Sequence, residues 1–271
     1  MSPHARDRAR EKRRNRKRQS VLALRAMESR RNKQVLGIVL ILVVVIGGLV
    51  GLSLVLHKDD KTVASGQVTS TSPTSAMLVA GCVAPPAVPT DKRARTLPDK
   101  RAAAGKTFIA TVTTNCGEIT VELDGAKAPQ TVASFLSLAK SGYWADSPCH
   151  RLTTEGIFVL QCGDPTGTGG GSPGYGYGVE NPPADFTFPP GTLAMARTSD
   201  PKSNGGQFFI VYKQTVLKDP AGYSIFGKIT SGMDIVDRVA AAGAKPADTN
   251  QNTAPLQLIS ILAVNVTEKK A

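Results

Sequence analysis

An uncharged apolar run, Val35–Leu56, divides the chain of 271 residues into two unequal parts. As a helix, its 22 residues would extend about 33 Å at about 1.5 Å per residue, enough to cross a hydrocarbon layer of about 30 Å. The apolar core of a cleaved secretory signal is shorter, about 7–15 residues, and ends at a small-residue cleavage site that is missing here. The run therefore predicts one transmembrane helix, with a cleaved signal as the alternative.

Basic residues are concentrated before this run. Residues 1–34 hold thirteen Lys and Arg against three acidic residues, so +10 of the formal net charge of +12 lies there and about +2 remains for the rest. Such a bias marks the cytoplasmic side of a membrane helix, which puts everything after His57 outside the cell membrane. A basic cluster beside a membrane also attracts anionic lipid. We therefore expect this tail to contact anionic lipid, and we expect no binding of nucleic acid, the other usual partner of a basic chain.

The composition changes again after the apolar run. Residues 57–105 are rich in Ser, Thr, Ala and Pro and show no sustained period, which is typical of a flexible spacer. Residues 106–271 instead carry short segments with strand and helix patterns. The predicted organisation is a basic cytoplasmic tail (1–34), a single transmembrane helix (35–56), a spacer (57–105) and one folded extracytoplasmic domain (106–271).

Strand and helix patterns in this last part predict its fold. Short β-branched and aromatic segments alternate with Gly- and Pro-rich turns, beginning with a hairpin over residues 107–123. Helical spacing occurs twice, once from Pro129 to Gly142 and once between Gly232 and Gly243. Many short strands with two helices indicate a mainly β domain, a closed antiparallel barrel of about eight strands capped by the two helices. The other expected strands fall within residues 149–152, 157–163, 191–196, 206–212, 223–229 and 256–266.

All four cysteines lie on the side that this topology makes external. An even number of cysteines in an oxidising compartment predicts two disulfides, and four cysteines allow three pairings. Cys149 and Cys162 flank a short hairpin, which favours that pair and leaves Cys82 for Cys116. Zinc binding is the alternative, but no CxxC spacing occurs and the three histidines do not cluster. We expect no metal site and no cofactor.

Four motifs follow one another in the folded part: CHRL (149–152), FVLQCGDPTGTGG (158–170), LAMARTSDPKSNGGQFFI (193–210) and SIFGKITSGMDIVD (224–237). In this order and at these spacings they resemble the cyclophilin family of peptidyl-prolyl cis-trans isomerases over about residues 106–266. The whole layout is similar to membrane-anchored bacterial cyclophilins. The resemblance implies a cyclophilin-like barrel and isomerisation of X-Pro bonds without a covalent intermediate.

The resemblance also implies roles for single residues. Arg151 corresponds to the catalytic arginine, and Gln161 and Gln207 correspond to the polar pair beside it. The residues at the family's substrate-binding positions are Phe158, Val159, Phe209 and Leu217 in the proline pocket, Ala196 and Arg197 along the peptide backbone, Gly167, Thr168 and Gly169 in the adjoining groove, and Tyr223 where many members have a histidine.

Five departures from the family pattern concern this site. Two are Tyr223 in place of the common histidine and the longer segment LTTEGI (152–157), and three more are substitutions. Val159 stands where methionine is usual, Arg197 stands where asparagine is common, and Val216 stands where some members have tryptophan or phenylalanine. The resemblance implies binding of the cyclic peptide cyclosporin, and these departures predict that this binding is weakened.

The chemistry of isomerisation needs few groups. Rotation about an X-Pro bond has a barrier of about 18–20 kcal/mol because amide resonance is lost. A fixed guanidinium that donates a hydrogen bond to the prolyl nitrogen favours the twisted state, in which that nitrogen gains a lone pair. We therefore predict that Arg151, oriented by Gln161, acts on proline-containing segments of exported proteins during folding, with Gln207 on the substrate backbone. The alternative is an extracytoplasmic module or chaperone that binds proline peptides with little turnover.

Overall fold

The computed structural model describes residues 79–91, 93–247 and 253–270. The predicted basic tail and the predicted transmembrane helix lie outside these residues. Within the described ranges, none of the helices combines the length and the apolar character that a bilayer span requires.

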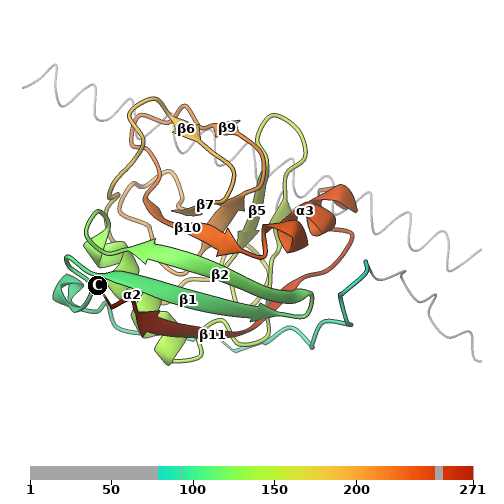
Figure 1. Cartoon of the computed structure of the whole chain (residues 1–271), viewed down its shortest axis with the longest axis horizontal. Helices are drawn as coiled ribbons and strands as arrows, with labels where there is room; N and C mark the ends of the chain where they lie inside the picture. The colour runs from blue at the N-terminus through green and yellow to red at the C-terminus, as the bar shows by residue number, and fades with distance from the viewer. Residues whose placement is uncertain (1–78, 92, 248–252, 271) are drawn as a thin grey trace, which may run out of the picture. The chain divides into compact units, whose positions relative to one another are not determined.

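The described residues form one curled antiparallel sheet of nine strands and a small sheet of two strands. The order across the large sheet is β3-β11-β1-β2-β10-β7-β8-β5-β4, and β6 pairs with β9 in the small one. Figure 1 shows β1, β2, β10 and β11 side by side. The strands are β1 (Thr107–Thr114), β2 (Gly117–Asp124), β3 (Ser147–Pro148), β4 (Arg151–Leu152), β5 (Val159–Cys162), β6 (Thr187–Phe188), β7 (Thr192–Met195), β8 (Phe208–Val211), β9 (Thr215–Val216), β10 (Ile225–Ser231) and β11 (Ser260–Glu268).

The large sheet differs from the closed barrel of about eight strands that the sequence predicted. Its edge strands β3 and β4 are not hydrogen-bonded neighbours in the described structure. Each of them has only two residues, and β3 pairs with β11 while β4 pairs with β5. The amide of Leu152 in β4 donates to the Thr253 carbonyl at 2.8 Å and not to β3, so the sheet curls without closing through a ladder.

The first hairpin shows how the alternating pattern produces this sheet. Every second residue of β1 from Phe108 to Thr114 is buried, as expected for a sheet with one face on the core. Asn115 and Cys116 form the turn, and Thr114 pairs with Gly117 on β2. The predicted hairpin is confirmed.

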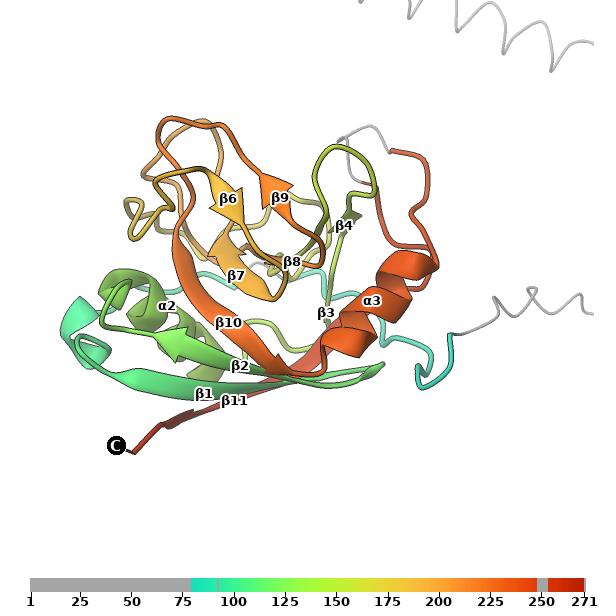
Figure 2. The same cartoon turned by 45° about the horizontal axis from the view of Figure 1, so that its top comes forward.

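Both predicted helices are present, as α2 (Pro129–Lys140) and α3 (Met233–Ala241). Pro129 opens α2 because its ring fixes a helical φ angle and because the N–H that it lacks would have no partner in the first turn. Gly142, with φ of 63°, follows the end of α2. Figures 1 and 2 show α2 and α3 toward opposite ends of β1 and β2. A short 3-10 helix, η1 (Lys100–Ala102), precedes β1.

Buried apolar side chains of the described residues form two clusters. The larger includes Phe135 of α2, whose ring centroid lies 4.6 Å from that of Trp144 and 5.7 Å from that of Phe226. The smaller consists of Val159, Phe188, Ala194, Phe209 and Val211. Because side chains alternate along a strand, Phe208 of β8 enters the larger cluster and Phe209 enters the smaller one. The two clusters therefore meet along β8.

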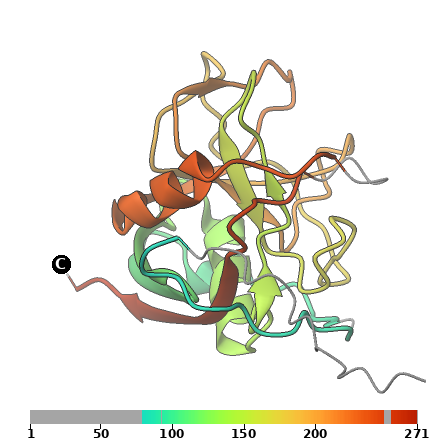
Figure 3. The ribbon, with the colours of Figure 1, turned by 90° about the vertical axis from the view of Figure 1, so that its right-hand side faces the viewer.

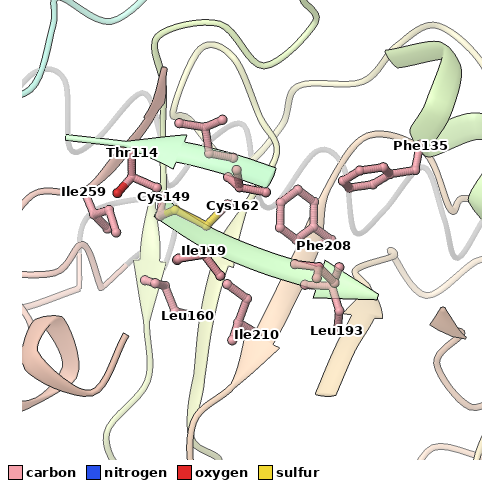
Figure 4. Close-up of a pocket in the computed structure, with 13 residues that line it drawn as sticks. Thr114, Ile119, Phe135, Cys149, Leu160, Cys162, Leu193, Phe208, Ile210 and Ile259 are labelled. Carbon is pink, nitrogen blue, oxygen red and sulfur yellow. A yellow bond between two sulfur atoms is a disulfide. The ribbon is translucent and has the colours of Figure 1, made fainter. Parts of the chain in front are cut away.

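Two disulfides, Cys82–Cys116 and Cys149–Cys162, join the four cysteines, which confirms the predicted pairing. Figure 4 shows the second disulfide among the side chains around a cavity of about 20 Å³ in the larger cluster, near Phe208. A cavity of this size has room for about one water molecule, so it is a packing gap of the core rather than a ligand site.

The end of the predicted spacer lies against the folded domain. Figure 3 shows residues 79–91 and 93–105 in teal along the surface of the domain. The Cys82–Cys116 disulfide and a hydrogen bond of 2.8 Å from the Val83 amide to the Asn115 carbonyl attach the start of this segment. The composition predicted a flexible spacer here, whereas cross-linking and hydrogen bonding to the domain fix these residues.

Candidate active site

A cavity of about 120 Å³ borders the smaller apolar cluster. The residues that line it are Arg151, Ile157, Val159, Gln161, Ala196, Arg197, Phe209, Leu217 and Tyr223. All of them except Ile157 were predicted as site residues from the sequence. The fold thus brings together side chains that are spread over more than seventy positions of the chain.

A chain of hydrogen bonds begins at the arginine of this cavity. Arg151 lies opposite Gln161 because β4 pairs with β5 at that position, and its Nη1 donates to Oε1 of Gln161 at 3.2 Å. Nε2 of Gln161 donates to Oε1 of Gln207 at 3.0 Å. Nε2 of Gln207 donates to the carbonyls of Gly169 and Gly171, both at 2.9 Å. These bonds fix the direction in which each side chain presents its polar atoms.

The guanidinium of Arg151 is partly withdrawn from water. Burial lowers its pKa from the ordinary value, and the nearby Tyr223 acts in the opposite direction. Arginine remains charged in proteins because its ordinary pKa exceeds about 12. A charge that water screens only in part interacts more strongly with a ligand dipole than it would in bulk solvent. The cavity therefore has a cation of fixed orientation on one wall.

Apolar side chains form another wall. Val159 of β5 and Phe209 of β8 are buried, and the ring of Phe209 lies 6.2 Å from that of Phe188 and 5.9 Å from that of Tyr223. Leu217 packs against the same cluster from the segment that follows β9. Val159 and Phe209 belong to the smaller cluster and Leu217 packs against it, so the packing of this cluster holds the wall in place.

Arg197 holds the loop beside the cavity. Its side chain is only 2% exposed and forms an ion pair of 2.7 Å with Asp219, while its Nε donates to the Gly222 carbonyl at 2.9 Å. The guanidinium also lies 4.5 Å from the ring centroid of Tyr223. The hydrogen bond from Arg197 lowers the pKa of the Asp219 carboxyl. The sequence predicted a role for the backbone at this position, and the structure adds a buried side chain that fixes Tyr223.

Phe158 does not line this cavity, although the sequence predicted it there. Its amide donates to Oγ1 of Thr215 at 2.9 Å, its ring centroid lies 6.0 Å from that of Tyr212, and Nζ of Lys213 lies 4.7 Å above its ring. Because Val159 faces the cavity, its neighbour in this extended segment faces the other way. Ile157 takes the place at the cavity, and no motif in the sequence indicated it.

A larger hollow of about 430 Å³ adjoins the cavity and shares several lining residues with it. Gly169 and Gln207 line this hollow. Gly167 and Thr168, which the sequence assigned to the same groove, do not line it. Thr168 lines a neighbouring hollow of about 410 Å³, which shares Gly170 and Gly171 with the first. A Cβ added at Gly167 would meet the ring of Pro148 at 2.7 Å, so this glycine packs closely against β3.

Asp164 shapes the loop that carries Gly169 and Gly171. Its buried carboxylate accepts hydrogen bonds from the amide and the hydroxyl of Thr166, each at 2.8 Å, and from the amide of Gly171 at 3.0 Å. Burial raises the pKa of Asp164, but these hydrogen bonds outweigh burial and the net pKa is lowered. No role was predicted for Asp164 from the sequence. The signal is present as an Asp two residues before a Thr in a Gly-rich loop, because such an Asp accepts from the backbone amide two residues on.

Comparisons with known proteins agree with this geometry. Residues 109–266, more than half of the chain, match the model of the family described as "Cyclophilin type peptidyl-prolyl cis-trans isomerase/CLD". A protein of Mycobacterium tuberculosis named "Probable peptidyl-prolyl cis-trans isomerase B" is 37% identical over 207 residues, which cover 70% of this chain and 65% of that protein. The chain thus spans slightly less than two thirds of this relative. A "Peptidyl-prolyl cis-trans isomerase-like 1" of Emericella nidulans is 39% identical over 161 residues, 58% of this chain and 94% of that protein.

A solved structure leads to the same family. The crystal structure of a cyclophilin type peptidyl-prolyl cis-trans isomerase of Cryptosporidium parvum, determined in the presence of the dipeptide Ala-Pro, matches with a TM-score of 0.50 and 30% sequence identity. The match covers 59% of this chain and 99% of that chain. The chain belongs to the cyclophilin-type peptidyl-prolyl cis-trans isomerase family.

Proposed function

We propose that this chain accelerates the cis–trans isomerisation of X-Pro peptide bonds. The observation that carries the proposal is the Arg151 guanidinium, held by Gln161 at the edge of a cavity with an apolar wall. A proline residue has matching parts, an apolar ring and an amide nitrogen next to it. The ring would occupy the cavity against Val159, Phe209 and Leu217, and the nitrogen would then lie on the side of Arg151.

The proposed reaction needs no covalent step. As the C–N bond twists, resonance is lost and the prolyl nitrogen becomes a better hydrogen-bond acceptor. A hydrogen bond from Arg151 therefore strengthens in the twisted state and is weaker in both planar states, which is the condition for lowering the barrier. Charge-assisted hydrogen bonds are about twice as strong as neutral ones. Gln161 contributes by holding the planar guanidinium in one orientation.

Gln207 has two tasks in this proposal. Its Nε2 is engaged with the loop carbonyls, and its Oε1 accepts from Gln161, so it fixes the orientation of Gln161. An amide oxygen carries two lone pairs, and Oε1 can therefore also accept an N–H of the substrate backbone. Ala196 and Arg197 line both the cavity and the adjoining hollow of about 430 Å³. Ala196 and the backbone of Arg197 would therefore lie along the same stretch of the substrate peptide.

Exchange spectroscopy on a proline-containing tetrapeptide tests the proposal. With a catalytic amount of the full chain, we expect cross-peaks between cis and trans forms at mixing times at which the free peptide, which exchanges over tens to hundreds of seconds, shows none. Saturable shifts of the peptide signals without such exchange would refute turnover and would support the binding module instead.

We further propose that Val35–Leu56 anchors the chain in the cell membrane, with residues 1–34 in the cytoplasm near anionic lipid and the isomerase domain outside. The charge distribution supports this topology, and so do the two disulfides, because disulfides persist in oxidising compartments. The substrates would then be exported proteins that are still folding. Protease added to intact cells should digest the domain; a domain that stays protected until the cells are lysed would contradict this topology.

Cyclosporin binding is expected to be weak. Val216, which stands where some family members have an aromatic residue, is 43% exposed. A valine offers a bulky cyclic peptide less apolar contact area than an aromatic ring does. Calorimetric titration of the Val216→Trp variant should show tighter binding than the unaltered chain, and equal affinities would contradict this interpretation.

A further inference from the structure

Residues 79–91 and 93–105, here called the strap, precede the part of the chain that matches the family model. The strap contacts both segments that support Gln207 in the proposed site. We propose that the strap positions Gln207 and, through Gln161, the guanidinium of Arg151. This inference rests on the proposed isomerase function.

The first contact reaches the loop under the side chain of Gln207. The amide of Arg95 donates to the carbonyl of Pro173 at 2.7 Å. A Cβ added at Gly174 would lie 3.7 Å from the Cβ of Ala94, so a methyl group on the loop would just reach the strap there. The same loop supplies both carbonyls that accept from Nε2 of Gln207. A displacement of the strap at Arg95 would therefore move these acceptors.

The second contact reaches the backbone next to Gln207. Nη1 of Arg93 donates to three carbonyls of the turn 142–145, at distances of 3.2, 3.0 and 2.9 Å. Inside this turn, the indole N–H of Trp144 donates to the carbonyl of Gly206 at 3.0 Å. Gly206 is the residue immediately before Gln207. Arg93 thus fixes the turn 142–145, and Trp144 of this turn fixes the main chain at Gly206, next to Gln207.

Charge favours the contact of Arg93. The turn 142–145 follows the C-terminus of α2, where carbonyls lack helical partners and carry the negative end of the helix dipole. The side chain of Arg93 is only 16% exposed, so its donors are largely committed to these carbonyls and to the carboxylate of Asp91 at 3.0 Å.

The strap is held on both sides of these contacts. The Cys82–Cys116 disulfide attaches it before Arg93. After Arg95, the carbonyl of Pro98 accepts from Nε2 of Gln130 in α2 at 3.0 Å. These two attachments hold Arg93 and Arg95, which lie between them, opposite the groups that they contact. Gln207 is consequently supported from the loop side and from the backbone side by one continuous segment.

A matched pair of variants of the full chain isolates the first contact. Arg95→Ala and Arg95→Pro both remove the side-chain hydrogen bonds to Ala94 and Ser141, but only Arg95→Pro removes the amide that donates to Pro173. We expect Arg95→Ala to keep kcat/KM within about twofold of the unaltered chain, and Arg95→Pro to lower it about fivefold through KM, the effect expected for one hydrogen bond. The NMR signal of the Gln207 side-chain amide should shift in the Pro variant alone.

A second set of variants isolates the contact of Arg93. Arg93→Ala should raise KM and shift the NMR signal of the Gln207 side-chain amide. Arg93→Lys should change both quantities less than Arg93→Ala does, because lysine still donates to carbonyls. Arg101→Ala is the matched control, since Arg101 belongs to the strap but is 86% exposed and pairs with Asp99. If one variant fails to fold, as judged by circular dichroism, the other set decides the question by the same two measurements.

The two possible failures are distinguishable. An unaltered chain without isomerase activity refutes the proposed function, whatever the variants do. An active chain in which Arg95→Pro matches Arg95→Ala, and in which Arg93→Ala matches Arg101→Ala, in both KM and the Gln207 signal, overturns the role of the strap and leaves the proposed function intact.

Discussion

The Cys149–Cys162 disulfide offers a quantitative test of how the fold supports the site. Cys149 lies two residues before Arg151, and Cys162 directly follows Gln161. The disulfide therefore cross-links the end of β5 to the segment just before β4, and these two strands hold the central pair of the site. We consider the double variant in which both cysteines become alanine.

The expected loss of stability follows from the length of the closed loop. The two cysteines are 13 positions apart, and a loop of about this size corresponds to about 3 kcal/mol of chain entropy at 25 °C. The Cys82–Cys116 disulfide closes a separation of 34 positions, for which the same relation gives about 4 kcal/mol. The shorter loop should thus cost less stability when opened, although it lies closer to the site.

Activity should show the opposite order. Without Cys149–Cys162, the hairpin that pairs Arg151 with Gln161 is held by only a few ladder bonds, because β4 has two residues. We expect kcat to fall about tenfold in this variant. Opening Cys82–Cys116 releases one attachment of the strap and should act mainly on KM.

Urea unfolding at 25 °C and the peptide isomerase assay measure the two effects. The free energy of unfolding should fall by about 3 kcal/mol in the Cys149→Ala, Cys162→Ala variant and by about 4 kcal/mol in the Cys82→Ala, Cys116→Ala variant. A variant without Cys149–Cys162 that keeps full kcat would refute the idea that this disulfide positions Arg151. A reversed order of stability losses would refute the loop-entropy reasoning.

Two further outcomes test the site and its supports. Arg197→Ala should weaken peptide binding several-fold in a fluorescence titration because it removes the guanidinium that lies over the Tyr223 ring. Arg101→Ala should not, because that side chain is 86% exposed and pairs with Asp99; equal effects would contradict the role of Arg197. Asp164 has a lowered pKa in the folded chain, so its contribution to stability is present above the unfolded pKa of about 3.9 and is lost as pH falls through the folded pKa. Asp164→Asn should therefore flatten the dependence of the urea midpoint on pH below about pH 4, and an unchanged dependence would contradict this assignment.

Much of the fold was predictable because the residues that the sequence pattern assigns to the inner face of a strand or helix are the ones that the structure buries. The alternation in residues 107–123 predicted β1 and β2 correctly, and Pro129 and Gly142 marked the limits of α2. The strands β3, β6 and β9 were not predicted. Each has two residues, too few to show a period, and tertiary pairing alone makes them extended.

The site was predictable where motif residues stand on paired strands. Arg151, Gln161 and Phe209 come together because β4, β5 and β8 are neighbours, and the motifs already named these residues. Phe158 was misplaced because a motif names a position but not the side of the chain on which the side chain lies. The contacts of the strap could not be read from its Pro- and Ala-rich composition, since they depend on backbone carbonyls far away in the sequence.

The most direct test of the central claim is the isomerase activity of the full chain with Arg151 changed. We expect Arg151→Ala to lower kcat/KM about tenfold to hundredfold, the effect of losing a hydrogen bond from a charged donor, and Arg101→Ala to leave kcat/KM unchanged. Arg151→Lys should fall between them, because lysine keeps the charge but lacks the planar fork that Gln161 orients. If Arg151→Ala were as active as the unaltered chain, Arg151 would not be the catalytic residue.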